Sequence, residues 1–300
     1  MKIGIIGAGA WGTALAISSA RGGNDITLWA FGDVAAKNMQ KGRENDNLPG
    51  VKIPENVFVT NDMINLRDCD AWLVATPSEF FAKTMQKARE FWGNQPIIIC
   101  TKGIDFDGNF MVDVAAGVGY DPELIGVMSG PQFAADVARG AASGATIAGG
   151  PAVLNAANAA FPEMTLVGTD DIIGVEICGA AKNAIAILMG YMEGQGKSES
   201  ERALRLTETY GEIVQLGRHL GAHTETFLGL CGLGDLFLSA TSRGSRNYRA
   251  GIDIARGMQM ATLVKKETIE GVNAARGLLK IAKKAGISTP NIEFLVGLVK

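Results

Sequence analysis

The sequence lacks an excess of positive charge, long apolar runs and a pattern of metal ligands. It has 28 lysine and arginine residues against 31 acidic ones, so the net charge of −3 predicts no nucleic-acid-binding surface. The longest apolar runs are short or broken by glycine, and we expect no membrane span. The chain has two histidines, His219 and His223, but Gly221 lies between them and no acidic ligand completes a zinc pattern. We therefore expect no bound metal.

Cysteine is also scarce, and no two cysteines form a C-x-x-C pair. A disulfide framework or redox motif is therefore not indicated, and we expect reduced, buried thiols. The N-terminus resembles a signal peptide only in Lys2 and the apolar residues after it, because early glycines follow and no clear cleavage region does. These features predict a cytoplasmic protein. The four cysteines are Cys69, Cys100, Cys178 and Cys231.

Glycine, by contrast, is abundant, with 39 residues, and three glycines mark the first motif. A short apolar run at 2–6 leads into Gly-Ala-Gly-Ala-Trp-Gly, and good helix formers follow. Gly7 permits a tight turn, Gly9 lets a pyrophosphate approach the backbone, and Gly12 lets the helix pack closely on the strand. The motif in this context predicts a dinucleotide site at the helix N-terminus. The alternative is an ordinary strand-to-helix turn.

Short apolar strands alternate with helical stretches in the first half of the chain, which predicts a doubly wound parallel α/β sheet covered on both faces. Only helical stretches follow residue 170, so we expect a second, all-helical domain, with the apolar stretch 172–192 buried in it. The predicted domains are 1–169 and 170–300. The expected strands are 2–6, 26–30, 71–75, 96–100, 125–128, 145–148 and 165–167, and the expected helices are 12–21, 33–41, 79–91, 133–139, 151–160, 172–192, 200–220, 253–256, 266–285 and 291–299.

Polar groups in both halves are candidates for binding or catalysis. Lys102 directly follows an expected strand, and ligands of doubly wound sheets bind beyond the carboxyl ends of strands. Lys182 lies in an apolar helix, where a lysine rarely stays without a partner or a function; the alternative is a lysine that snorkels to the helix edge. Asp235 lies in a glycine-rich apolar turn or simply caps a helix. The segment 242–247 gathers the groups that grip phosphate, or it is an exposed basic loop.

Taken in order, these segments resemble the bacterial-type NAD(P)-dependent glycerol-3-phosphate dehydrogenases over nearly the whole chain. The resemblance implies a Rossmann-type dinucleotide domain followed by a helical substrate domain. It also implies that sn-glycerol 3-phosphate and dihydroxyacetone phosphate are interconverted with NAD or NADP, in support of phospholipid synthesis. The matching segments are GAGAWGTALA, LPGVKIP, TKGI, SGPQFA, GVEICGAAKNAIAI, GLCGLGDL, GSRNYRAG and IEG at 269–271.

The resemblance also implies residue roles, with Lys182 as the general acid/base. A free lysine has a pKa of about 10.4, and we expect Lys102, with partial burial in addition, to lower that value for Lys182. Asp235 would orient the ammonium or a substrate hydroxyl. The implied substrate-binding positions are Lys102, Gly130, Gln132, Lys182, Asp235, Ser245, Arg246 and Asn247, and the implied cofactor-binding positions are Gly7, Gly9, Ala10, Trp11, Gly12, Phe31, Lys102, Ala134, Arg246 and Glu270.

Three features depart from the family pattern. Gln132 stands where the family usually has serine or threonine, and the chain stops sooner after Pro290 than family members usually do. The second strand runs into Phe31, with neither an acid for a ribose 2′-hydroxyl nor an arginine for a 2′-phosphate. The choice between NAD and NADP then stays open, with three residues nearby as substitutes: Asp33, Lys37 and Arg43.

Two other functions remain open at this point. One is a related dehydrogenase of the same architecture that acts on a 3-hydroxy acid or a ketopantoate-like substrate. The other is a non-catalytic NAD-binding sensor. The arginine, serine and asparagine at 245–247 favour a phosphorylated triose as the small-molecule substrate. The sequence leaves the oligomeric state open, with a homodimer as one alternative.

Overall fold

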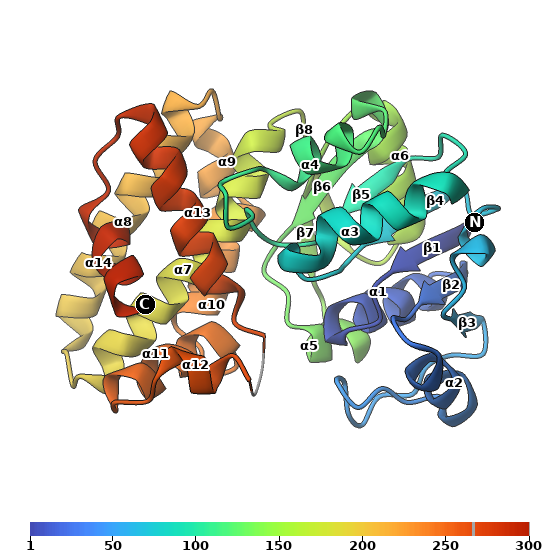
Figure 1. Ribbon diagram of the computed structural model, residues 1–300, viewed down its shortest axis with the longest axis horizontal. Helices are drawn as coiled ribbons and strands as arrows, with labels where there is room; N and C mark the ends of the chain where they lie inside the picture. Colours follow the sequence, from blue (N-terminus) through green and yellow to red (C-terminus); the bar gives the residue numbers. More distant parts are fainter. Residues whose placement is uncertain (266–267, 300) are drawn as a thin grey trace. The chain divides into compact units, whose positions relative to one another are not determined.

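The computed structural model describes residues 1–265 and 268–299. The chain divides into two compact units, shown in Figure 1. Unit 1 comprises Met1–Thr101, Val112–Met128 and Gln132–Asp170, and unit 2 comprises Lys102–Met111, Ser129–Pro131 and the chain from Asp171 onward. The two short segments differ from the predicted assignment of all residues up to 169 to one domain. They matter because Lys102 and Gly130 belong to the helical unit.

The sheet has eight strands in the order β3-β2-β1-β4-β5-β6-β7-β8. Six neighbouring pairs, from β3·β2 through β5·β6 and again β7·β8, are parallel. The order reverses beside β1, which confirms the doubly wound prediction and places the ligand end at the carboxyl ends of the strands. The strands are β1 (Lys2–Ile6), β2 (Asp25–Trp29), β3 (Val57–Thr60), β4 (Ala71–Val74), β5 (Ile97–Ile99), β6 (Ile125–Ser129), β7 (Gly144–Ala148) and β8 (Thr165–Thr169). The sequence missed β3, a four-residue edge strand too short for a clear pattern.

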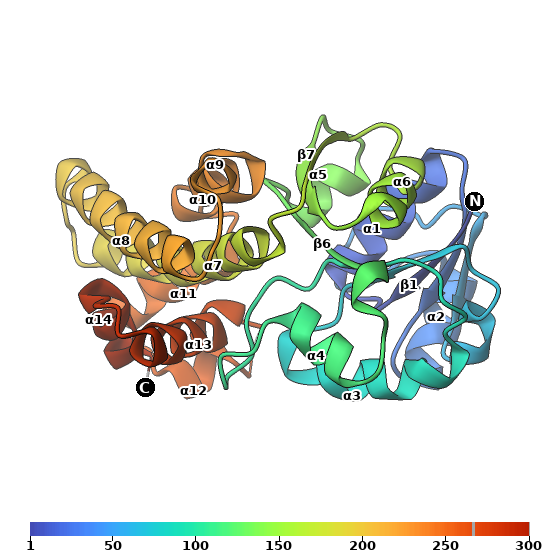
Figure 2. The ribbon, with the colours of Figure 1, turned by 90° about the horizontal axis from the view of Figure 1, so that it is seen from above.

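Helices cover both faces of this sheet, as Figure 2 shows. On one face Leu15 of α1 (Ala10–Arg21) and Val153 of α6 (Pro151–Ala160) belong to one buried cluster that also contains Ile3 and Ile5 of β1. On the other face Phe81 of α3 is fully buried. Burial of one such side chain stabilises the folded state by roughly 1.5–3 kcal/mol. Both helical layers therefore stabilise the sheet, and with it the end of β1 at which the glycine turn begins. The elements are α1 (Ala10–Arg21), α2 (Asp33–Gly42), η1 (Met63–Leu66), α3 (Ser78–Ala88), η2 (Arg89–Phe91), α4 (Met111–Gly117), η3 (Pro122–Leu124), α5 (Ala134–Ala138) and α6 (Pro151–Ala160).

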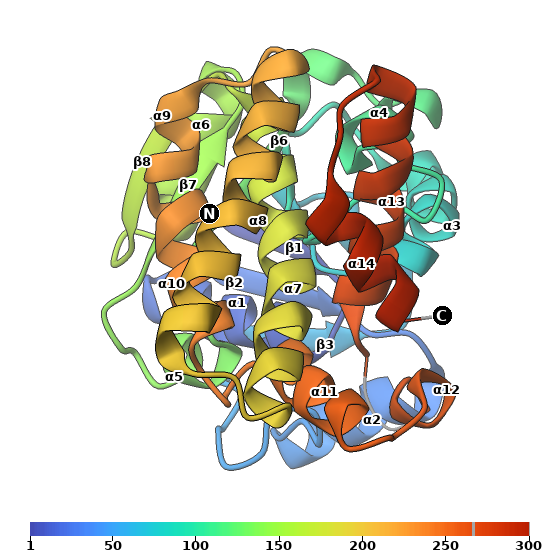
Figure 3. The same ribbon diagram turned by 90° about the vertical axis from the view of Figure 1, so that its left-hand side faces the viewer.

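Unit 2 is built around α7 (Ile172–Gly194), which confirms that the apolar stretch 172–192 is a buried helix. Its most extensive contacts with other helices are those with α8, α10, α11 and α13, and Figure 3 shows several of these around it. The further elements are α8 (Glu199–His219), α9 (Thr224–Leu228), a π-helical turn η4 (Leu230–Gly234), α10 (Asp235–Ala240), α11 (Arg246–Ala255), α12 (Met260–Leu263), α13 (Glu270–Ala285) and α14 (Pro290–Leu298). Of the expected helix 266–285, residues 266 and 267 lie outside the described residues.

We expected glycine to break the apolar runs into short pieces, but α7 continues through its glycines. It is a continuous helix of 23 residues with a mean hydropathy of 1.7, and 89% of its apolar window is buried in the structure. It is the one helix in residues 1–265 and 268–299 that is long and apolar enough to cross a membrane. Burial on most sides is what the core helix of a globular unit shows, and its glycines serve close packing.

The start of α11 also corrects the sequence analysis, which expected a helix only at 253–256. The helix begins at Arg246, and the Oγ of Ser245 accepts a hydrogen bond from the backbone N–H of Tyr248 at 3.4 Å. Ser245 is therefore an N-cap, and the residues predicted to bind phosphate stand at a helix N-terminus rather than in a loop. The polar residues before the cap obscure the helical period in the sequence.

Candidate active site

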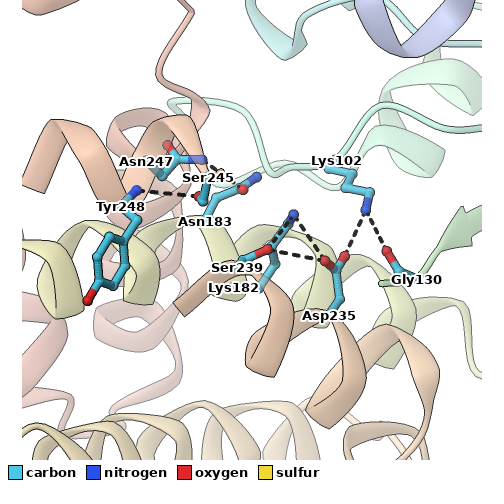
Figure 4. A network of polar contacts seen from close by, with 9 residues as sticks. All are labelled: Lys102, Gly130, Lys182, Asn183, Asp235, Ser239, Ser245, Asn247 and Tyr248. Atoms are coloured by element: carbon cyan, nitrogen blue, oxygen red, sulfur yellow. Dashed lines mark hydrogen bonds and ion pairs between the residues drawn. The ribbon is translucent and has the colours of Figure 1, made fainter. Parts of the chain in front are cut away.

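Two lysines bind one buried carboxylate in unit 2, as Figure 4 shows. The Nζ of Lys102 lies 2.7 Å from Oδ2 of Asp235, and the Nζ of Lys182 lies 3.1 Å from Oδ1. Asp235 is fully buried, and each lysine side chain is 11% exposed. A buried carboxylate needs partners, and two cations on one carboxylate leave a net positive charge. The cluster is therefore suited to an anionic ligand.

Each member of this cluster comes from a different element. Lys102 stands three residues after the end of β5, Lys182 lies on α7, and Asp235 is the first residue of α10. The π-helical turn η4 delivers Asp235, and there a Cβ on Gly232 would lie 2.2 Å from the carbonyl oxygen of Phe227. Asp235 thus binds the lysines instead of acting as a helix cap, and Lys182 is not a snorkelling lysine.

Ser239 is the second hydrogen-bond acceptor of the Lys182 ammonium. It was not predicted from the sequence. The Nζ of Lys182 donates to Oγ of Ser239 at 3.0 Å, and that hydroxyl donates to Oδ1 of Asp235 at 3.2 Å. The only signal was its spacing of four residues from Asp235, one turn along α10. An ammonium has three hydrogens, so these two acceptors leave one for a substrate. Lys102 similarly donates to the carbonyl oxygen of Gly130 at 2.9 Å.

Burial lowers the pKa of Lys182 to about 8, because desolvation disfavours its ammonium. The Asp235 carboxylate raises that pKa, and the positive charge of Lys102 lowers it. From the sequence we expected Lys102 to be the main cause of the lowered pKa of Lys182 and burial to add to it. In the structure burial is the larger cause. The reason is that Lys102 acts across a carboxylate that both ammonium groups touch, whereas burial acts on Lys182 directly.

Three predicted phosphate contacts stand at the N-terminus of α11. The N-terminus of a helix offers unpaired backbone N–H groups and the positive end of the helix dipole to an anion. Ser245 is buried, whereas Arg246 is exposed. The guanidinium of Arg246 has no hydrogen-bond or ion-pair partner among the residues that the structure describes. It is therefore available to a ligand.

Asn247 differs from this picture because its amide is largely engaged within the protein. Its Nδ2 donates to Oδ1 of Asn183 at 2.9 Å, and its Oδ1 accepts from the N–H of Gly271 at 3.0 Å. The amide thus ties α7, α11 and α13 together and keeps one N–H hydrogen for a ligand. Asn183, which directly follows Lys182, was missed by the sequence analysis. Glu270, the first residue of α13, raises the pKa of Lys182 and so lies within electrostatic reach of it.

In unit 1 the glycine motif has the geometry that a dinucleotide requires. Gly7 has a φ of 112°, and a Cβ on Gly12 would lie 1.8 Å from the carbonyl oxygen of Gly7. By contrast, a Cβ on Gly9 would meet nothing within 4 Å. Space therefore exists beside the backbone at the start of α1, where Ala10 and Trp11 form the first helical residues. These residues fit the pyrophosphate of NAD or NADP.

The contacts of the residues near the carboxyl end of β2 reduce the number of candidates for selecting NAD or NADP. Phe31 is 86% exposed there, and Lys37 pairs with Asp33 at 2.7 Å. Arg43 donates to the carbonyl oxygen of Val57 at 2.6 Å, at the start of β3 and thus at the opposite end of the parallel strands. Arg43 is therefore removed from the candidates for binding a 2′-phosphate.

Gln132 is buried in unit 1, and only the nitrogen of its side-chain amide has a hydrogen-bond partner within the described residues. Its Nε2 donates to Sδ of Met164 at 3.4 Å, while its Oε1 has no hydrogen-bond partner within the described ranges. A buried oxygen without a donor is costly, so this amide can accept a hydrogen bond from a ligand. Ala134, two residues later, begins α5 and is half-buried. All four cysteines are buried, as expected, and none forms a disulfide within the described residues.

Comparisons with known proteins identify the family of the chain. Residues 2–153 match the family model for the NAD-dependent glycerol-3-phosphate dehydrogenase N-terminus, and residues 171–299 match the model for its C-terminus. A glycerol-3-phosphate dehydrogenase (NAD(P)+) of Rhodospirillum rubrum is 39% identical over 297 residues, covering 96% of this chain and 85% of the relative. One of Parvibaculum lavamentivorans is 34% identical over 305 residues, covering 99% and 92%.

A solved structure extends the similarity to three dimensions. The crystal structure of glycerol-3-phosphate dehydrogenase from Coxiella burnetii superposes with a TM-score of 0.93 at 29% identity, covering 99% of this chain and 94% of that one. The family models together span both units, and the relatives match nearly from end to end. The chain therefore belongs to the NAD-dependent glycerol-3-phosphate dehydrogenase family.

Proposed function

We propose that this protein interconverts sn-glycerol 3-phosphate and dihydroxyacetone phosphate, with NAD or NADP as the hydride carrier and Lys182 as general acid/base. The observation that carries the proposal is the ammonium of Lys182. It is buried, its pKa is lowered to about 8, and its two protein acceptors leave one hydrogen for a substrate. A general acid works best when its pKa lies near the operating pH.

During reduction, negative charge develops on the carbonyl oxygen of dihydroxyacetone phosphate as hydride reaches the carbon. The remaining N–H of Lys182 stabilises that oxygen and then gives it a proton. In the reverse direction, neutral Lys182 removes the hydroxyl proton of sn-glycerol 3-phosphate while hydride leaves the carbon. The bound nicotinamide supplies or accepts the hydride.

The other groups of the cluster hold Lys182 ready for this step. Asp235 and Ser239 fix the direction of its ammonium, and Lys102 balances the charge of Asp235. Arg246 and the N-terminus of α11 would bind the phosphate, which is remote from the reacting carbon. Such remote contacts can supply binding energy for the reaction.

Replacement of Lys182 by alanine tests the assignment directly. We expect kcat for dihydroxyacetone phosphate reduction to fall by a factor of about 10² or more, because general acid catalysis contributes roughly 10²–10⁴-fold. Binding of NADH, measured by its fluorescence, should be retained. A Lys182→Ala enzyme with wild-type kcat would contradict the role of Lys182.

A substrate panel separates this function from the two alternatives. Oxidation of NADH and of NADPH is followed with dihydroxyacetone phosphate, ketopantoate and acetoacetyl-CoA as separate substrates. Turnover only with the triose phosphate is expected, since Arg246 at the start of α11 suits a phosphate group. Turnover only with ketopantoate or acetoacetyl-CoA would favour a related dehydrogenase, and tight NADH binding without turnover would favour a sensor.

Three finer expectations belong to the same proposal: a supply of glycerol 3-phosphate for phospholipids, a cytoplasmic location and a homodimer. Exposed apolar side chains in unit 2, among them Leu228, Leu233 and Phe237, support an interface between two copies. Light scattering on the purified protein tests the dimer, and cell fractionation tests the location. Lipid labelling after depletion of the protein tests the metabolic role.

A further inference from the structure

One carboxylate outside the lysine cluster collects hydrogen bonds from three elements of unit 2. Glu193, near the end of α7, accepts from Nε and Nη2 of Arg243 at 3.0 and 2.7 Å. Its other oxygen accepts from Nη1 of Arg202 at 2.9 Å and from the hydroxyl of Tyr248. Hydrogen bonds from Tyr248 and Arg243 lower the pKa of Glu193, so the carboxylate is ionised at neutral pH.

Two of these partners flank the residues proposed to bind phosphate. Arg243 belongs to the segment 242–245 that leads into α11, and Tyr248 lies on the first turn of α11. Arg249 supports the same segment from the helix side, because its Nη1 donates to the carbonyl oxygens of Arg243 and Gly244 at 2.9 and 3.1 Å. The side chains and the backbone of this segment are therefore held from two directions.

The three arginines of this region differ in their hydrogen-bond partners. Arg243 binds Glu193, and Arg249 binds backbone carbonyls, whereas Arg246 has no partner within the part of the chain that is described. The two engaged arginines fix where α11 begins, and this start point determines where Arg246 and the capping Ser245 stand. Displacement of a binding group by about 1 Å can cost about 10²-fold in catalysis.

We propose that Glu193 is a positioning residue for the phosphate site, acting through Arg243 and Tyr248 on the start of α11. The inference rests on the proposed phosphate site at that helix. Glu193 does not touch the substrate in this arrangement. Its removal should therefore affect only substrates that carry the phosphate.

Kinetics of Glu193→Ala test the proposal with two substrates. We expect KM for dihydroxyacetone phosphate to rise about tenfold or more, with kcat at saturation and KM for NADH close to wild type. Activity with dihydroxyacetone, which lacks the phosphate, should be unchanged. Arg243→Ala should reproduce the effect; because its side chain is 74% exposed, this variant also serves if Glu193→Ala fails to fold.

Glu212→Ala is the matched control. Glu212 also accepts several hydrogen bonds in unit 2, from the N–H and Nδ2 of Asn291 and the N–H of Ile292, but it anchors α14. Its loss should lower stability and leave KM for dihydroxyacetone phosphate unchanged. An equal loss with both substrates in Glu193→Ala and Arg243→Ala, or a fall in kcat at unchanged KM, would show that Glu193 is merely structural and overturn the inference.

Binding of inorganic phosphate separates this inference from the proposed function. Calorimetry should show weaker phosphate binding by Arg243→Ala than by wild type, whether or not wild type reduces dihydroxyacetone phosphate. Wild-type protein that binds phosphate but does not turn over the triose phosphate would refute the function alone. Equal phosphate affinity in the variant and wild type would refute the positioning role alone.

Discussion

Replacing the two neighbours of Lys182 should move its pKa in opposite directions. Asp235 raises the pKa of Lys182, and Lys102 lowers it, while burial sets the overall value near 8. The variant Asp235→Asn removes the attractive charge and leaves Lys102 without a counter-ion, so the pKa should fall. The variant Lys102→Met removes the repulsive charge and leaves Asp235 to Lys182 alone, so the pKa should rise.

The size of each shift follows from the distances. Both ammonium nitrogens contact the same carboxylate, at 2.7 and 3.1 Å. Two like charges about 8 Å apart, the largest separation that this permits, repel by roughly 2 kcal/mol at an effective dielectric constant of about 20. At 1.36 kcal/mol per pKa unit this is about 1.5 units upward for Lys102→Met. Asp235 is closer to Lys182, so Asp235→Asn should shift the pKa downward by about 2 units or more.

The assay is the pH dependence of kcat/KM for reduction of dihydroxyacetone phosphate, which reports the free enzyme. Reduction needs protonated Lys182, so the rate falls as pH rises through its pKa. We expect the alkaline limb at a pH of about 8 in wild type, about 9 or higher in Lys102→Met and about 6 in Asp235→Asn. Oxidation of sn-glycerol 3-phosphate needs neutral Lys182 and should show the opposite limb, lost as pH falls through the same values.

The direction of the two shifts decides the outcome, even if each variant also loses absolute rate. Alkaline limbs that coincide in all three enzymes would show that another group titrates. Limbs that move the same way in both variants would show that the charges of Asp235 and Lys102 do not act on the general acid as the geometry requires. Either result would refute the assignment of Lys182.

Two further predictions concern the platform that carries the phosphate site. A Cβ on Gly190 of α7 would lie 1.9 Å from the carbonyl oxygen of Tyr248, so Gly190→Ala should separate α7 from α11 and lower the free energy of unfolding by roughly 1–3 kcal/mol in urea. Gly211→Ala, in α8 with open space around its Cβ, is the control and should be neutral or stabilising. Arg246→Ala should leave the urea midpoint unchanged and raise KM for dihydroxyacetone phosphate about 10–100-fold, because it removes a charge-assisted contact to the phosphate. A destabilised Arg246→Ala with normal KM would contradict that role.

The sequence was most informative where a residue type conflicts with its neighbours. Lys182 in an apolar helix, and Asp235 in an apolar turn, stand out because burial of a charge is costly without a partner. The glycine motif is local and can be recognised from its spacing together with the apolar run before it and the helix formers after it. The pairing of Lys102 with Asp235 is not local, since 133 residues separate them, and unit 2 must fold before they meet.

The residues that surround the candidate site left no such signal. Ser239, Asn183 and Glu193 are ordinary polar residues of helices, and only the neighbours that packing brings to them give them a role. The π-helical turn before Asp235 also escapes a pattern based on regular periods. Tertiary packing therefore decides which of many polar helical residues belong to a site.

Charge within unit 2 explains how an acidic protein can bind a phosphate ester. The chain carries a net charge of −3, yet Lys102 and Lys182 share the single carboxylate of Asp235. Likewise Arg202 shares the carboxylate of Glu193 with Arg243, in the segment before the N-terminus of α11, where Arg246 has no partner among the described residues. In each group the cations outnumber the carboxylates, so each keeps positive charge. The lysine group is buried, where its charge acts more strongly on a bound anion than it would in water, whereas Arg243 is 74% exposed and its charge is screened by solvent. The carboxylates fix the directions of the cations that they bind, and in the proposed function one ammonium hydrogen of Lys182 and the guanidinium of Arg246 remain for the substrate.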